Sequence, residues 1–305
     1  MADLAAQISL FIGFVLLGYL ISRFSGKGRL ANDYVTALLI KLLVPVLVIY
    51  TLLTASPETL AEIPTVLFLA VLVQLLGPAI MFLRLRGRDV DNATKGVFYI
   101  SVTFTNAVFI PLPLVMMFMG ERGVPFVVLF SLAQFALLVT LGSFLGSVFA
   151  EKQSGWKDMA RRALTFPPLL AAILAVALIF TGCAVPETVE SVLSYSGTLT
   201  THLALVSVGL GLGVRFSLSD VRAALEVVAI RQVIVPLLMV PIVFLSGLSA
   251  ISSRIVILEA LMPPAMLTVA YAGGFGLDSE RAATIVTVGT LLLLPVLPFV
   301  PLLLS

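Results

Sequence analysis

The sequence has few charged residues and almost no cysteine or histidine. Only 11% of its 305 residues are Asp, Glu, Lys or Arg, whereas 60% are hydrophobic, and the mean hydropathy is +1.16. Soluble globular domains carry about 25% charged residues, so this composition excludes an ordinary soluble enzyme, a nucleic-acid-binding protein and a disordered chain. The single cysteine, Cys183, and the single histidine, His202, exclude a disulfide framework and argue against a metal site of several such ligands.

Long hydrophobic segments, bounded by charged or proline- and glycine-rich stretches, fill most of the chain. A membrane-spanning helix needs about 20 apolar residues, and ten such segments predict an all-α integral membrane protein with ten transmembrane helices. The first five are Leu4–Phe24, Tyr34–Thr54, Ile63–Leu83, Gly96–Met119 and Val124–Ala150. The second five are Ala163–Gly182, Val189–Val214, Ala223–Leu245, Ser252–Phe275 and Ala282–Leu304.

The positive charges alternate from one connection to the next. Even-numbered connections hold only Arg122 and Arg254, and Lys41 lies within a span. All other Lys and Arg residues belong to the odd-numbered connections and their flanks. Because cytoplasmic loops carry an excess of Lys and Arg, we expect a multi-pass protein of the cell (plasma or inner) membrane with both termini outside.

The predicted spans divide into two repeats of five. Residues 1–150 form the first repeat, residues 151–162 a cytoplasmic linker and residues 163–305 the second repeat. Five is an odd number, so the second repeat must enter the membrane in the opposite orientation. The expected architecture is therefore an inverted repeat.

Prolines interrupt the fourth helix of each repeat at matching places. Pro111 and Pro113 interrupt helix 4, and Pro263 and Pro264 interrupt helix 9. Helix-breaking residues in corresponding positions of two inverted halves indicate the binding site of a secondary transporter. Ordinary proline kinks, which membrane helices tolerate, are the alternative.

Both breaks are predicted to lie near the middle of the bilayer. At the helical rise, Asn106 lies about 16 Å from Lys95, and Pro264 about 15 Å from Arg254. Half-helices that begin after Pro113 and Pro264 would direct their N-termini at this depth, and helix N-termini favour carboxylates and other anions. An anionic substrate is the resulting hypothesis.

Short motifs in both halves resemble the auxin efflux carrier (AEC/PIN-like) family of transporters. The first break resembles the Asn-Thr-Gly-Phe-Leu-Gly-x-Pro-Leu stretch of that family, and two later segments resemble its Asn-Pro-Pro and Leu-Ala-Leu-x-Ser-x-Gly-Leu motifs. The matching stretches are Thr105-Asn-Ala-Val-Phe-Ile-Pro-Leu-Pro-Leu114, Phe166-Pro-Pro-Leu169 and Leu203-Ala-Leu-Val-Ser-Val-Gly-Leu210.

The resemblance implies a ten-helix fold shared with bile-acid sodium symporters. Helices 1, 2, 6 and 7 would form a scaffold, compatible with a homodimer, and helices 3–5 and 8–10 a transport domain in which the broken helices 4 and 9 cross. It also implies elevator-type transport of a small organic anion, carboxylate or auxin-like, without enzymatic chemistry. A sodium-coupled carrier of the bile-acid-symporter type, or a channel or receptor with a transporter fold, stay open as alternatives.

Polar residues at the breaks are the candidates for substrate contact. Asn106 either contacts the substrate or caps the broken helix. Thr105 and Thr268 either donate to the substrate or bond a carbonyl one turn back. Gln134 falls where plant members of the resembling family place a glutamine near the substrate.

Ionisable residues within the spans are candidates for coupling to H⁺ or Na⁺; no other cofactor is expected. His202 lies mid-membrane and is a candidate for substrate contact and for carrying a proton; a structural, hydrogen-bonded histidine is the alternative. Glu259 either binds a coupling cation or pairs with Arg254, and pairing is the preferred interpretation. Lys41 and Arg231 either attract an anion or anchor the helices at the interface within snorkelling reach of the surface, and anchoring is the preferred interpretation.

Overall fold

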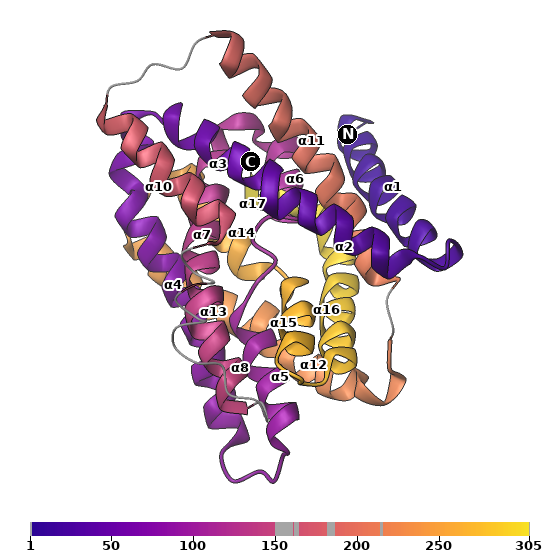
Figure 1. Ribbon diagram of the computed structural model, residues 1–305. Coiled ribbons are helices and arrows are strands. Elements are labelled where there is room, and N and C mark those ends of the chain that lie inside the picture. Colours follow the sequence, from indigo (N-terminus) through magenta and orange to yellow (C-terminus); the bar gives the residue numbers. More distant parts are fainter. Residues whose placement is uncertain (1, 150–160, 162–164, 182–186, 214–215, 305) are drawn as a thin grey trace.

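The computed structural model describes residues 2–149, 161, 165–181, 187–213 and 216–304, and this part of the chain is helical throughout, apart from turns and one isolated bridge (Figure 1). Most of the predicted linker 151–162, and also Cys183 and Arg215, lie outside the described residues. The helices of the first half are α1 (Ala2–Phe24), α2 (Gly28–Leu38), η1 (Leu39–Leu43), α3 (Val44–Leu53), α4 (Pro57–Leu85), α5 (Asn92–Thr103), α6 (Pro111–Phe118), η2 (Gly120–Gly123), α7 (Val124–Leu137), η3 (Leu138–Gly142) and α8 (Ser143–Phe149). Those of the second half are α10 (Pro167–Phe180), α11 (Glu187–Leu212), η4 (Leu218–Asp220), α12 (Val221–Ala229), η5 (Ile230–Ile234), α13 (Val235–Leu245), α14 (Ala250–Leu261), α15 (Leu267–Gly274), α16 (Ser279–Leu293), η6 (Leu294–Phe299) and α17 (Val300–Leu304).

Within the residues that the structure describes, six helical segments are long and apolar enough to cross a membrane. Many of their large hydrophobic side chains point outward, as expected where lipid replaces water as the neighbour. The protein is therefore an all-helical membrane protein. The six segments are Ala6–Phe24, Gly28–Leu53, Pro57–Leu85, Gly120–Phe149, Leu218–Leu245 and Ser279–Leu304, and Pro167–Phe180 is a shorter apolar helix.

The two helices with paired prolines are interrupted, as the sequence predicts. The chain leaves the helix between α5 and α6 and again between α14 and α15. The first half-helix begins at Pro111 and not after Pro113, because a proline in the first turn lacks only an N–H that has no partner there anyway. The second begins at Leu267, after a short non-helical stretch that contains Pro263 and Pro264.

Two π-helical turns each precede a Val-Pro pair. η1 leads into Val44-Pro45 and η5 into Val235-Pro236. A proline ring clashes with the carbonyl one turn earlier and offers no N–H to it, and the wider π turn accommodates both effects. These turns contain Lys41 and Arg231, the two basic residues predicted to lie inside spans.

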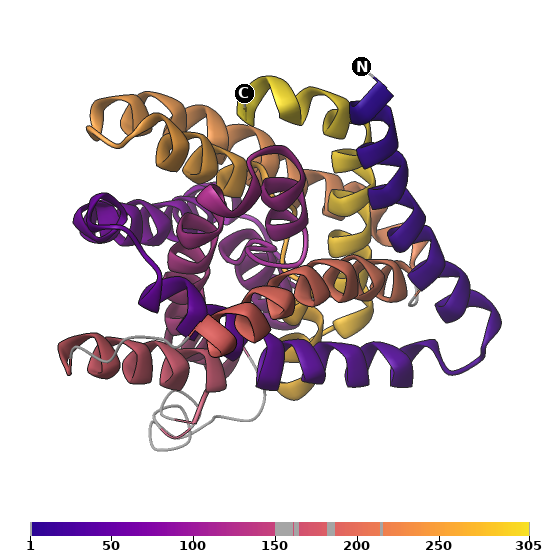
Figure 2. The ribbon, with the colours of Figure 1, turned by 90° about the horizontal axis from the view of Figure 1, so that it is seen from above.

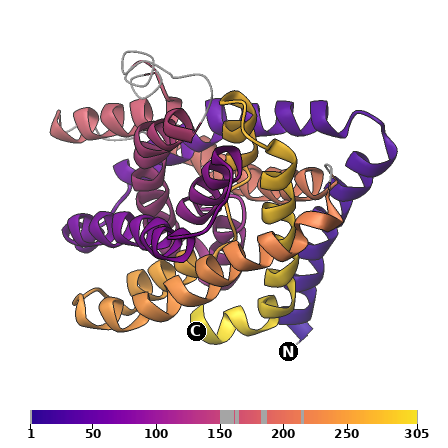
Figure 3. The same ribbon diagram turned by 90° about the horizontal axis from the view of Figure 1, so that it is seen from below.

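The helices pack in two groups. In the first group α11 packs along α1 and against α2 and α3, and α10 packs on α3 (Figure 1). Gly18 and Gly209 make the α1–α11 contact close, because a Cβ on either would lie 2.1 Å or 1.9 Å from a carbonyl oxygen of the other helix. The second group joins α4, α5, α7 and α8 to α12–α16; seen from below, α12 (orange) lies next to α16 (yellow) (Figure 3).

Candidate functional site

The two helix breaks cross and pair through their backbones. Thr105 and Pro264 form an antiparallel bridge. The Asn106 N–H donates to the Pro263 carbonyl at 2.8 Å, and the Ala265 N–H donates to the Phe104 carbonyl at 2.8 Å. Unpaired backbone groups are tolerated at membrane depth only when protein or trapped water satisfies them. Each break therefore supplies the hydrogen bonds that the other lost by leaving the helix.

Gln134, on α7, fixes the first break in place. Its Oε1 accepts from the Thr105 N–H at 3.0 Å and from the Thr105 hydroxyl at 2.7 Å, while its Nε2 donates to the Thr105 carbonyl at 2.7 Å. Gln74 Nε2, on α4, donates to the same Oε1 at 2.8 Å. Both ends of the Gln134 amide thus bond to protein groups and hold the first break in place.

Asn106 has an unused hydrogen-bond donor. Its side chain is buried, its Oδ1 accepts from the Phe109 N–H at 3.0 Å, and its Nδ2 has no partner. The oxygen of this amide therefore caps the break, as one of the two interpretations expects, while its nitrogen remains free. Asn106 lines a cavity of about 20 Å³, which has room for about one water molecule.

A larger cavity lies between α2 and α15, next to the crossing of the two breaks. Its volume is about 490 Å³, and Met266, Leu267 and Ile40 line both this space and the small cavity beside Asn106. We call it the α2–α15 vestibule; its wall consists of Arg29, Asn32, Asp33, Thr36, Ala37, Ile40, Lys41, Met266, Leu267, Val269, Ala270, Gly273 and Ser279. Two basic groups and one acid face a space in the size range of ligand pockets.

A second cavity of about 590 Å³ has the opposite charge balance. Glu58, Glu62 and Glu121 line it together with Arg122. The Ser249 N–H and hydroxyl both donate to Glu62, at 3.0 and 3.2 Å. The α2–α15 vestibule thus has a surplus of basic groups, and this second cavity has a surplus of acidic groups.

Several predicted residues have partners that fit a structural role. Thr268 donates to the Ala265 carbonyl at 2.6 Å, so its hydroxyl supports the second break. The four prolines of the breaks are buried and shape the crossing, without a polar side-chain atom to offer. His202 lies away from the crossing: its ring packs on Phe14 of α1, with ring centroids 4.7 Å apart.

Two interpretations of buried charges were wrong. Glu259 does not pair with Arg254, whose Nη1 donates to the Leu304 carbonyl at 3.3 Å, and the Glu259 carboxylate is fully buried with no hydrogen-bond partner. Arg231 is not an interface anchor, because it is also fully buried and donates to the Val73 carbonyl at 3.3 Å. The distance of Arg231 from the end of its own helix does not reveal that α4 and α14 cover its side chain. Lys41 is exposed, as an anchor would be.

Sequence reasoning missed Gln74 and Met266. Gln74 is a fully buried amide in the long apolar helix α4, and its isolation among hydrophobic residues is the signal that identifies it. Met266 separates the vestibule from the crossing and packs on α11, where a Cβ added to Gly211 would lie 1.5 Å from the methionine Cε. No sequence pattern indicates that contact.

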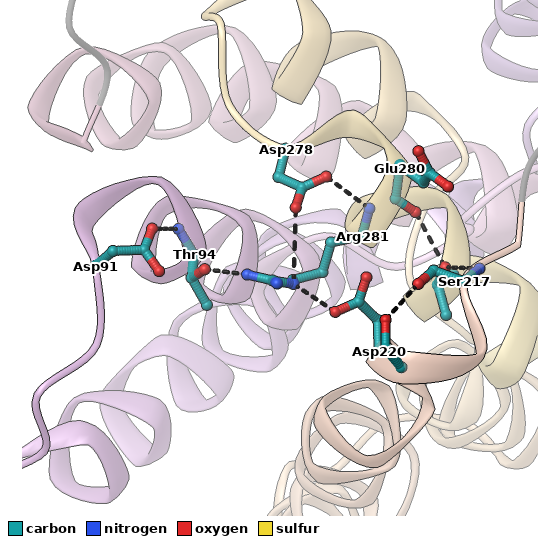
Figure 4. Close-up of polar contacts among 9 residues, drawn as sticks. Asp91, Thr94, Ser217, Asp220, Asp278, Glu280 and Arg281 are labelled. Carbon is teal, nitrogen blue, oxygen red and sulfur yellow. Dashed lines mark hydrogen bonds and ion pairs between the residues drawn. The ribbon is translucent and has the colours of Figure 1, made fainter.

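A polar network joins α5, η4 and α16 away from the crossing (Figure 4). Arg281 Nε donates to Asp220 at 3.0 Å, its guanidinium also donates to the Thr94 hydroxyl, and its backbone N–H donates to Asp278 at 2.9 Å. Asp91 accepts from the Thr94 N–H at 2.8 Å. The Thr94 hydrogen bonds, with a smaller effect of the Arg281 charge, hold the pKa of Asp91 below its ordinary value of 3.8.

Comparison with known proteins agrees with a transport role. The family model described as "Membrane transport protein" matches residues 8–155 and 156–301. The chain belongs to this family. It is the family that contains the auxin efflux carriers, so the resemblance seen in the sequence is confirmed.

Two archaeal relatives are similar over much of the membrane transport protein chain. An uncharacterised transporter of Methanothermobacter thermautotrophicus is 25% identical over 285 residues, which cover 93% of each chain. Another, of Methanocaldococcus jannaschii, is 26% identical over 229 residues, 73% of this chain and 71% of the relative. The family and these names support a transporter in a membrane.

Proposed function

We propose that this membrane transport protein is a secondary transporter that moves a small organic anion, carboxylate or auxin-like, by elevator-type alternating access. The observation that carries the proposal is the free amide of Asn106 at the crossing of two broken helices, next to the vestibule that contains Arg29 and Lys41. Broken helices that meet within a membrane fold are typical of transporter binding sites.

The charges and not the helix N-termini support an anionic substrate. Pro111 and Pro113 remove two of the N–H groups at the start of α6, and the N–H groups of Leu112 and Leu114 donate to carbonyls of the break. This terminus therefore offers fewer donors than expected from the helix dipole. The basic groups of the vestibule supply the attraction, and Asn106 Nδ2 supplies a donor for a carboxylate oxygen.

The two packing groups support a moving and a static part. We propose that α1–α3, α10 and α11 form the scaffold, that the remaining helices form the transport domain, and that together they make ten spans in two inverted repeats. The helices pack more extensively within each group than between the groups, and Met266 on Gly211 lies at the boundary. The crossing near Asn106 holds about 20 Å³, so substrate entry requires Met266 and Leu267 to move.

Ligand-dependent stability of the purified protein tests the proposal. Carboxylates, including indole carboxylates, should raise the Tm, whereas the corresponding neutral amides should not. Asn106→Ala should weaken the affinity of the best carboxylate at least tenfold, because a hydrogen bond to a charged group contributes about 1.5–3 kcal/mol. Asn92→Ala, an exposed asparagine at the start of α5, is the matched control and should leave affinity unchanged. If both variants change the affinity equally, Asn106 has only a structural role.

Counterflow in proteoliposomes separates the proposal from its alternatives. Unlabelled substrate inside the vesicles should accelerate entry of labelled substrate, because a carrier returns faster when loaded. Large unitary currents without counterflow would identify a channel. A requirement for Na⁺ would identify a symporter of the bile-acid type, and ligand-induced stabilisation without flux would identify a receptor.

A further inference from the structure

Met266 lies where three cavities meet. It lines the space of about 20 Å³ beside Asn106, the α2–α15 vestibule of about 490 Å³, and a third cavity of about 40 Å³ between α2, α11 and α16. Among the described residues, it alone lines all three. Leu267 borders the first two but not the third, which Met266 shares with Gly211 of α11. The Met266 side chain therefore separates these spaces and also contacts α11.

Three glycines near the end of α11 meet different neighbours. A Cβ on Gly209 would collide with backbone atoms of α1, and a Cβ on Gly213 would collide with Ser22 of α1. A Cβ on Gly211 would overlap the Met266 Cε and lie 3.1 Å from its Sδ, and it would meet no backbone atom. Gly209 and Gly213 thus allow α11 to pack on α1, whereas Gly211 provides the space in which the end of Met266 lies.

The backbone of Met266 is fixed by the crossing, but its side chain is not. The Ala265 N–H donates to the Phe104 carbonyl at 2.8 Å, and the Met266 carbonyl accepts from the Val269 N–H at 3.2 Å. The side chain is only partly buried, and methionine is unbranched with three rotatable bonds. Met266 can therefore change its rotamer while the two breaks stay paired.

We propose that Met266 is the gate between the α2–α15 vestibule and Asn106, and that Gly211 holds this gate closed. With Met266 over Gly211, the space beside Asn106 has room for about one water molecule. When the methionine leaves Gly211, the cavities join and a ligand reaches the Asn106 amide. The proposed transport function, on which this step rests, places α11 in the scaffold and Met266 in the moving part. Movement of the transport domain along α11 then opens the gate.

Access of a reagent to a cysteine beside Asn106 tests the gate without a substrate. In a Cys183→Ser background, Ala107→Cys places a thiol at the wall of the small cavity, where the native side chain is 2% exposed. N-ethylmaleimide is neutral, so its reaction does not depend on the charge of the substrate, and mass spectrometry of the purified protein gives its rate. Labelling of a buried thiol follows the population of the open form, so Met266→Ala should raise the rate at least about tenfold. Met81→Ala, which truncates a fully buried methionine of α4, is the matched control and should leave the rate unchanged.

Gly211→Ala tests how the gate is held closed. The added Cβ displaces the end of Met266 and meets no backbone atom, so this variant should fold and should also raise the labelling rate. Combined with Met266→Ala, it should give the rate of Met266→Ala alone, because both changes act on one side chain. An unchanged or lower rate in Gly211→Ala would overturn the role of Gly211. Equal rates with and without Met266→Ala, or equal acceleration by Met81→Ala, would overturn the gate itself.

The size of the ligands that bind gives a second readout, which depends on the proposed function. Carboxylates that are too bulky to stabilise the wild type should raise the Tm of Met266→Ala, because the shorter side chain leaves more space beside Asn106. Met81→Ala should keep the ligand range of the wild type. The labelling experiment contains no substrate, so it stays valid if no carboxylate binds. Carboxylate binding with an unchanged labelling rate in Met266→Ala would keep the proposed function and overturn the gate.

Discussion

At the scale of single residues, the crossing separates groups that hold the chain from groups that are free to bind. Gln134 uses both ends of its amide on Thr105, so a substrate would have to break protein hydrogen bonds to reach it. Asn106 uses only its oxygen, and its Nδ2 stays available beside the cavity. Two side-chain amides that look alike in the sequence therefore differ in the structure: Gln134 positions the chain, and Asn106 keeps a free donor.

Asp91 gives a residue-scale prediction about acid stability. Its folded pKa lies below 3.8 because Thr94 bonds its ionised form. A depressed pKa contributes stability that is present above about pH 3.8 and lost as the pH falls through the lower, folded value. Asp91→Ala should lower stability at neutral pH by about 1 kcal/mol through loss of the α5 N-cap.

Asp91→Asn is the matched control for that prediction. Asparagine caps a helix about as well as aspartate but does not titrate, so this variant should keep most of the neutral-pH stability. Thermal unfolding followed by circular dichroism between pH 3 and 7 measures both effects. If wild type and Asp91→Asn lose stability equally on acidification, the Thr94 contact does not contribute to the pH dependence.

At the scale of helices, the sequence predicts the breaks but not what surrounds them. Proline chemistry is local, so Pro111 and Pro264 are sufficient to predict that two helices are interrupted. The pairing of Thr105 with Pro264 joins residues far apart in the chain, and no local rule gives that register. The burial of Arg231 was missed for the same reason: the helices that cover it come from other parts of the sequence.

Gly289 of α16 gives a prediction about how tightly the second break is packed. A Cβ there would lie 2.8 Å from Pro264 Cδ and 2.9 Å from Gln232 Oε1. Gly→Ala in a helix is usually stabilising, but overpacking costs about 1–3 kcal/mol. Gly289→Ala should therefore lower the Tm and weaken carboxylate affinity, because the break must shift.

Gly274, at the end of α15, is the control for Gly289. Nothing lies within 4 Å of a Cβ built there, so Gly274→Ala should leave Tm and affinity close to wild type. Differential scanning fluorimetry with and without ligand gives both values in one experiment. An unchanged Tm in Gly289→Ala would mean that α16 or the break shifts without cost, so that α16 does not hold the break in place.

At the scale of the whole molecule, the arrangement of charges and termini makes one topology testable. The start of α1 (indigo) and the end of α17 (yellow) lie on the same side of the molecule (Figure 2). An even number of spans requires this, and ten is the number proposed. The positive-inside rule then sets the orientation, because the connection between α4 and α5 is rich in arginine whereas the turn at η2 has one.

Cysteine labelling in sealed cells checks the orientation. In a Cys183→Ser background, single cysteines at Asp89, between α4 and α5, and at Glu121, in η2, should label from opposite sides, because α5 and α6 together make one crossing in the proposed topology. Both positions are exposed, so a membrane-impermeant maleimide reaches each from its own side. Glu121→Cys should react in intact cells and Asp89→Cys only after permeabilisation. If both cysteines react in intact cells, the broken helix returns to the side it entered from and does not cross the membrane, which contradicts the inverted repeat. If only Asp89→Cys reacts in intact cells, the repeat is kept but the basic α2–α15 vestibule lies on the outer face.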